Sequence, residues 1–162
     1  MRSRRLASML VVMKSETLEL DRTPAREILV LDRDECVSAL RGGHVGRVVV
    51  VLPNGAPVIR PVNYVFDVPS QSIVFRTDFG SKLYALLQSR AAWFEVDEID
   101  LPDQAGWSVI VAGASEEVIS THELERLGKS GPTPWVPGTK HRWFMIHATT
   151  VSGRRVIPTP NP

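Results

Sequence analysis

Two apolar runs on either side of an Asn-Gly turn constrain this fold more than any other feature of the sequence. Val48 to Leu52 is an unbroken run of β-branched and apolar residues, and Val58 to Phe66 is the returning run. Asn54-Gly55 lies between them, and Asn-Gly favours a turn whose twist matches that of two antiparallel strands. The sequence therefore predicts a β-hairpin. Pro61 places its second strand at an edge or a bulge, because proline cannot donate a ladder hydrogen bond.

The remaining pattern predicts more strands than helices. Further strands are expected over 72–77, 91–96, 107–119 and 143–151, with the last continuing toward Val156. Short helices are expected over 32–41, 81–89 and 121–127. Six strands joined mostly by hairpins fit a small closed or partly closed antiparallel barrel, and they do not fit alternating βαβ units. Gly113 within its strand predicts a bulge or a bend.

The first of these helices has a complete start signal. Asp32 and Glu35 form a capping-box pattern, Cys36 and Leu40 give an apolar face, and Gly42 is a natural stop. Cys36 is the single cysteine, so no disulfide forms within the chain. Its position predicts a buried thiol.

Length and charge narrow the class of protein. A chain of 162 residues with 43% hydrophobic and 23% charged residues is typical of one soluble globular domain. A net charge of +1 does not indicate a nucleic-acid partner. The N-terminal apolar stretch is short and lacks a cleavage pattern, so we expect a cytoplasmic protein with no membrane partner. We expect a disordered extension over 1–29, the domain over 30–157, and a disordered tail over 158–162.

The segment that follows the strand 72–77 departs from local rules. Lys82 lies in the first turn of an expected helix, where the helix dipole disfavours a cation unless an anion binds there. A phosphate site would explain it, and the residues that could supply the site are Arg76, Thr77, Ser81 and Lys82. The alternative is a solvated lysine paired with Asp78.

In the order and spacing of its motifs the chain resembles the flavin-binding split-barrel proteins related to pyridoxamine 5′-phosphate oxidase, over roughly Leu31 to Arg155. The motifs that carry the resemblance are Glu35-Cys36, Val45-Gly46-Arg47, Pro57 to Tyr64, Phe75-Arg76-Thr77, Gly80-Ser81-Lys82, Phe94 to Asp97, Gly106 to Val109 and Gly153-Arg154-Arg155.

This resemblance implies a mostly β, six-stranded antiparallel Greek-key split β-barrel that forms a homodimer with FMN in the cleft between subunits. The strand residues implied along the isoalloxazine and ribityl chain are Arg60, Pro61, Val62 and Asn63. The residues implied around the phosphate are Arg76, Thr77, Ser81 and Lys82. Trp107 is implied to approach from the partner protomer. The implied activity is FMN-dependent oxidoreduction of a small substrate that the sequence does not identify.

The chain departs from pyridoxamine 5′-phosphate oxidases at its C-terminus, which lacks their substrate-binding segment, so that activity itself is not predicted. A deazaflavin-dependent reductase and a non-enzymatic flavin- or heme-binding module remain alternatives. The candidate axial ligands for a heme are His44, His141 and His147, the last two on one face of an expected strand. No metal site is predicted, and the acidic residues Glu95, Asp97, Glu98 and Asp100 are expected in a solvated turn.

Overall fold

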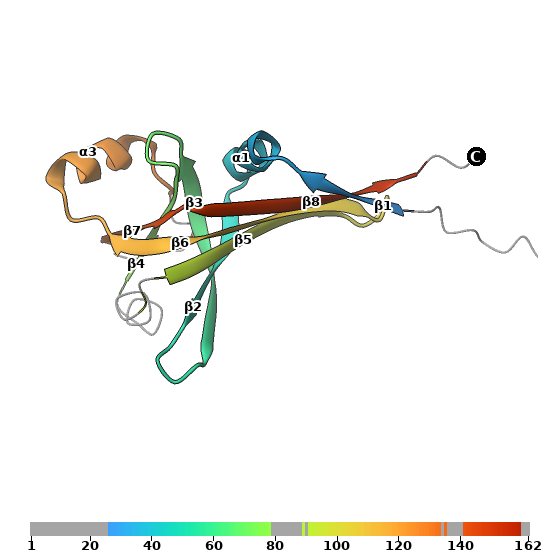
Figure 1. Cartoon of the computed structure of the whole chain (residues 1–162). Helices are drawn as coiled ribbons and strands as arrows, with labels where there is room; N and C mark the ends of the chain where they lie inside the picture. Colours follow the sequence, from blue (N-terminus) through green and yellow to red (C-terminus); the bar gives the residue numbers. More distant parts are fainter. Residues whose placement is uncertain (1–25, 79–88, 90, 134, 136–140, 160–162) are drawn as a thin grey trace, which may run out of the picture.

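The computed structural model describes residues 26–78, 89, 91–133, 135 and 141–159. Its strands are β1 (Arg26–Leu31), β2 (Val45–Val51), β3 (Pro57–Asp67), β4 (Ser72–Thr77), β5 (Ala91–Asp100), β6 (Ala105–Glu117), β7 (Arg142–His147) and β8 (Thr150–Pro158). They pair antiparallel in the order β1-β8-β6-β5-β2-β3-β4-β7, and β6 also pairs with β7. Strands β2 to β7 therefore close into a barrel, and β8 and β1 extend one side of it (Figure 1). The predicted six-stranded antiparallel barrel is confirmed.

The hairpin of β2 and β3 forms around the predicted Asn-Gly turn. Leu52 donates its backbone N–H to the Ala56 carbonyl over 2.9 Å, and Gly55 has a φ of 84°. A positive φ of this size favours glycine, which has no Cβ to clash with its own backbone. This local signal therefore sets the register in which Val51 faces Pro57.

Helix α1 (Arg33–Gly42) begins as the sequence predicts. The Asp32 side chain accepts a hydrogen bond from the Glu35 backbone, and the Glu35 carboxylate accepts one from the Asp32 backbone. Cys36 and Leu40 are fully buried, and α1 contacts β3, β6 and β8. The predicted buried thiol is confirmed, and burial raises the pKa of Cys36.

Two predictions at the ends of the domain are wrong. Residues 26–29 were expected in a disordered extension, but they belong to β1, which pairs with β8 from Arg26↔Pro158 to Leu31↔Gly153. The last strand is not continuous either, because β7 ends at His147 and β8 begins at Thr150. Residues 1–25 lie outside the described residues, and so do residues 81–88 of the helix predicted over 81–89.

Strand β6 changes partners at Gly113, where the sequence predicts a bend. Up to Ala112 it pairs with β8, and from Ser115 it pairs with β7. A Cβ on Gly113 would lie 1.7 Å from the carbonyl oxygen of His147, so only glycine lets the two backbones approach this closely. This crossing is where the extended sheet turns into the barrel.

Apolar side chains fill the barrel, and a second cluster lies outside it. The barrel core includes Tyr64, Phe75, Phe94 and Phe144. Helix α3 (Thr121–Ser130), capped by Ser120, covers the outer cluster, which consists of Val74, Val118, Leu127 and Met145. In the described part of the chain, no helix is both long and apolar enough to cross a membrane.

Candidate functional site

One edge of β3 carries backbone groups that no described strand pairs. β3 pairs with β2 along Pro57–Asn63, whereas β4 pairs with β3 only over Tyr64–Asp67. Among the described residues, the other edge of Pro57–Asn63 has no strand beside it. Backbone groups alternate in direction along a strand, and Tyr64 donates to the His44 carbonyl on the β2 side, so Ile59, Pro61 and Asn63 direct theirs to the open edge. The N–H of Asn63 and the carbonyl groups of Pro61 and Asn63 can therefore form hydrogen bonds with a bound molecule. The predicted residues Arg60 to Asn63 all lie on this stretch.

Asn63 and Arg76 share the outer face of the barrel. Asn63 comes directly before Tyr64 on β3, and Arg76 comes directly after Phe75 on β4. Tyr64 and Phe75 face each other across the two strands, and their rings point into the core. The Asn63 side-chain oxygen accepts a hydrogen bond from the Trp135 backbone over 3.0 Å. The Arg76 guanidinium lies 4.9 Å from the centre of the Trp143 ring. This face therefore combines an amide, a cation and two tryptophans beside the open edge of β3.

The other predicted residues are less accessible. Val62 and Thr77 are buried, with Val62 in the barrel core, and the Thr77 hydroxyl donates to the Asp78 carbonyl over 3.3 Å. Arg60 and Pro61 are exposed. Ser81 and Lys82 lie outside the described residues, so the structure does not test the phosphate site that they were predicted to complete.

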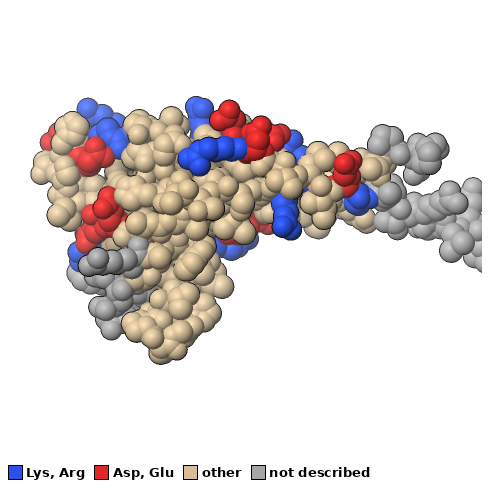
Figure 2. Space-filling model, viewed as in Figure 1, with Lys and Arg blue, Asp and Glu red and all other residues tan. Residues whose placement is uncertain are grey.

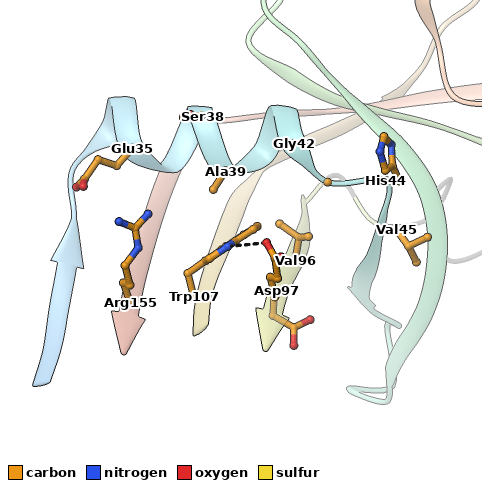
Figure 3. Close-up of a pocket in the computed structure, with 12 residues that line it drawn as sticks. Glu35, Ser38, Ala39, Gly42, His44, Val45, Val96, Asp97, Trp107 and Arg155 are labelled. Atoms are coloured by element: carbon orange, nitrogen blue, oxygen red, sulfur yellow. Dashed lines mark hydrogen bonds between the residues drawn. The ribbon is translucent and has the colours of Figure 1, made fainter. Parts of the chain in front are cut away.

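Trp107 lies on the opposite face of the sheet from Asn63. Its neighbours Val109 and Val111 alternate with it and point into the core, so Trp107 continues the inner face beyond the closed barrel. Its indole N–H donates to the Glu98 carboxylate over 3.0 Å (Figure 3). Within one protomer the structure does not bring Trp107 to the open edge of β3.

An ion-pair cluster that was not predicted lies on the outer face. Arg47 on β2 lies 2.8 Å from Glu95 and 2.6 Å from Asp97, both on β5. The solvated turn predicted for these two carboxylates is wrong, because they lie within a strand. Their spacing of two residues within a strand was the available signal, since such residues share one face.

The histidines do not form a common site. The two ring nitrogens of His147 lie 3.0 Å from the Ser72 hydroxyl and 2.9 Å from the Glu116 carboxylate. His141 and His44 are exposed, and His141 precedes β7 rather than sharing a strand face with His147. Within the described ranges, no group of three or more His, Cys, Asp or Glu residues could hold a metal ion.

Comparisons with known proteins show which family this chain resembles. A family model for pyridoxamine 5′-phosphate oxidase matches residues 32–155. An uncharacterized protein of Mycobacterium tuberculosis, Rv0080, is 32% identical over 138 residues, which are 82% of this chain and 88% of that protein. The FAD binding protein from Mycobacterium smegmatis has a TM-score of 0.67 and 28% identity over 82% of this chain and 100% of its own.

A third similar structure is a conserved protein of unknown function from Corynebacterium diphtheriae. It has a TM-score of 0.67 and 33% identity, and the match covers 82% of this chain and 98% of that one. The family match begins at the helix cap Asp32 and ends at Arg155 on β8, so it includes the whole barrel. This chain belongs to the pyridoxamine 5′-phosphate oxidase family.

Proposed function

We propose that this protein binds a flavin along the open edge of β3, with FMN as the preferred form, and acts as an oxidoreductase on a small substrate. The observation that carries the proposal is the edge of Pro57–Asn63 that no described strand pairs, which lies beside Asn63 and Arg76. A flavin ring presents donors and acceptors that such an edge can pair, and a cation suits its phosphate. The flavin, once bound, supplies the redox chemistry.

Membership of the family and the similarity to a protein named for FAD binding support a flavin of some kind. The chain's own residues orient the cofactor: the backbone of Arg60 to Asn63 contacts the ring and the ribityl chain, and Arg76 and Thr77 lie at the phosphate end. In this proposal Ser81 and Lys82 complete the phosphate contacts.

The proposal includes a C₂ homodimer with the cofactor at the dimer cleft. Since Trp107 lies on the other face of its own sheet, it can approach a flavin only from the partner protomer. A cytoplasmic location completes the proposal, because the single buried cysteine needs no oxidising compartment.

The absorption spectrum of the protein as purified tests the cofactor class, because flavin, deazaflavin and heme differ in it. Titration with FMN, FAD and riboflavin then tests the phosphate contact. Arg76→Gln and Lys82→Ala are each expected to weaken FMN about tenfold to a hundredfold, the size of a lost charge-assisted hydrogen bond, and to leave riboflavin nearly unchanged. Arg41→Gln, an exposed arginine in the last turn of α1, is the matched control.

Equal weakening of FMN and riboflavin would show that these cations do not contact the phosphate. A protein that binds none of the three flavins, and carries heme as purified, would overturn the proposal. Turnover of a reductant by the flavin-loaded protein separates an oxidoreductase from a binding module.

A further inference from the structure

A groove with a volume of about 510 Å³ lies between α1 and the inner face of the sheet beyond the closed barrel. Its helical wall consists of Glu35, Ser38, Ala39 and Gly42, which follow one another at the i, i+3, i+4, i+7 spacing of a single helix face. The last three are small, so the helix leaves space above the strands. This volume is within the roughly 300–1,000 Å³ typical of small-molecule sites.

The floor of the groove is a row of three side chains on neighbouring strands. Glu98 on β5 faces Trp107 on β6, and Trp107 faces Arg155 on β8. The Trp107 indole N–H donates to one oxygen of Glu98, which fixes the plane of the ring. Beyond the row, Val96 and Val45 line the end of the groove away from Arg155 (Figure 3).

At the other end of the groove lie two opposite charges, Arg155 and Glu35, that do not form an ion pair with each other. Arg155 is half-buried, and among the residues that the structure describes its guanidinium forms neither an ion pair nor a hydrogen bond. Glu35, across the groove from it, uses one carboxylate oxygen to accept the hydrogen bond from the Asp32 backbone and keeps the other (Figure 3). A cation and a carboxylate thus face the same space without contacting each other.

We propose that this groove binds a small zwitterion with an aromatic body, of the class of the aromatic α-amino acids. The carboxylate of the ligand pairs with Arg155, and its ammonium donates to Glu35. The ring packs on Trp107 and extends toward Val96. A simple anion fits less well, because Glu35 and Glu98 both repel it.

This inference goes beyond the proposed flavin function and does not rest on it. Asn63 and the open edge of β3 lie on the other side of the sheet. Trp107 is the one residue that both proposals use, so the groove is tested on the protein without flavin.

The test is isothermal titration calorimetry of the full-length protein, without flavin, using L-phenylalanine as the probe. 2-Phenylethylamine lacks its carboxylate and 3-phenylpropionate lacks its ammonium, so both are expected to bind at least about tenfold more weakly. Saturable binding of L-phenylalanine with this ranking supports the site. No binding at millimolar concentration, or equal binding of 3-phenylpropionate, overturns it.

Two variants that each remove one charge test which side chains contact the ligand. Arg155→Gln and Glu35→Gln are each expected to weaken L-phenylalanine at least about tenfold. The glutamine at position 35 still accepts the Asp32 hydrogen bond, so α1 keeps its cap. Arg154→Gln is the matched control, because Arg154 is the next residue on β8 and points to the opposite face.

An equal loss in Arg154→Gln would overturn the assignment, because a general loss of charge would explain it. FMN affinity, measured on the same variants by quenching of flavin fluorescence, is expected to stay unchanged. FMN binding that fails while L-phenylalanine still binds contradicts only the flavin proposal, and the reverse result contradicts only this one.

Discussion

Asp67 has the most complete set of partners among the described carboxylates. It is only 7% exposed, it accepts hydrogen bonds from the backbone and the hydroxyl of Ser70, and Arg126 donates to both of its oxygens over 2.7 and 2.9 Å. The hydrogen bonds from Arg126 are the main cause that lowers the pKa of Asp67, against the opposing effect of burial. This pair attaches α3 to the turn between β3 and β4.

A lowered folded-state pKa means that Asp67 stabilises the fold above its unfolded pKa of about 3.9, and that the stabilisation is lost as the pH falls below this value. Asp67→Asn is therefore expected to lower the free energy of unfolding by about 2–3 kcal/mol at pH 7. Thermal melts of both proteins at decreasing pH should converge at the acid end. Glu125→Gln, which changes an exposed carboxylate in the middle of α3, should behave like wild type. A difference that does not depend on pH would contradict this account.

Among helices and strands, the sequence predicts correctly those whose start, stop or turn signals lie within a few residues. Helix α1 and the β2–β3 hairpin have their cap and their turn within a few residues, and both form as predicted. Strand β1 was missed because its partner β8 lies at the other end of the domain. The break between β7 and β8 falls at Ala148-Thr149, which carries no glycine, proline or asparagine to announce a turn.

Truncation tests the corrected boundary. Deleting residues 1–15 is expected to change the melting temperature little, whereas deleting residues 1–30 should lower it by several degrees. The longer deletion removes most of a strand that pairs with β8 over its whole length. Differential scanning fluorimetry of the two truncated chains measures both effects. Equal melting temperatures would show that β1 contributes nothing to stability.

The crossing of β6 gives a second test at this scale. Gly113→Ala is expected to destabilise the fold by several kcal/mol or prevent folding, because its Cβ would overlap the His147 carbonyl and backbone would have to move. Gly128→Ala in α3 is the matched control: nothing lies within 4 Å of its Cβ, and alanine should stabilise that helix by about 0.5–1 kcal/mol. Urea unfolding of both variants measures the difference. A loss of less than about 1 kcal/mol in the free energy of unfolding of Gly113→Ala would contradict the close approach of the two backbones at this crossing.

For the whole molecule, the sequence predicted the family and the strand that carries the candidate site, but not how its residues divide between faces. Asn63 and Arg76 meet on the outer face, whereas Trp107 lies on the inner face of the extension. Strand periodicity alone could not show this, because β6 continues past the closed barrel before it turns. The groove under α1 was missed for the same reason, since Glu98, Trp107 and Arg155 become neighbours only through sheet pairing.

The outer face of the extended sheet carries apolar side chains that one protomer leaves exposed. Ile59, Trp93 and Ile110 are 52%, 41% and 46% exposed, and Ile59 and Trp93 both face Val49 on the strand between them. The lobe formed by the β2–β3 hairpin shows no charged side chain in the view of Figure 2. The ion-pair cluster of Arg47, Glu95 and Asp97 borders these apolar side chains, since Glu95 faces Ile110. Exposed apolar side chains with a charged border are typical of protein–protein interfaces.

If this face forms the C₂ interface, a carboxylate within it should separate the protomers, because burying an unpaired charge costs several kcal/mol. Ile59→Asp and Ile110→Asp are expected to sediment as monomers where the wild type sediments as a dimer. Ile119→Asp is the matched control, since Ile119 is 82% exposed and lies outside this face, in the connection between β6 and α3. It should remain dimeric. A wild-type monomer at micromolar concentration with flavin still bound would rule out the dimer cleft and, with it, any contribution of Trp107 from a partner.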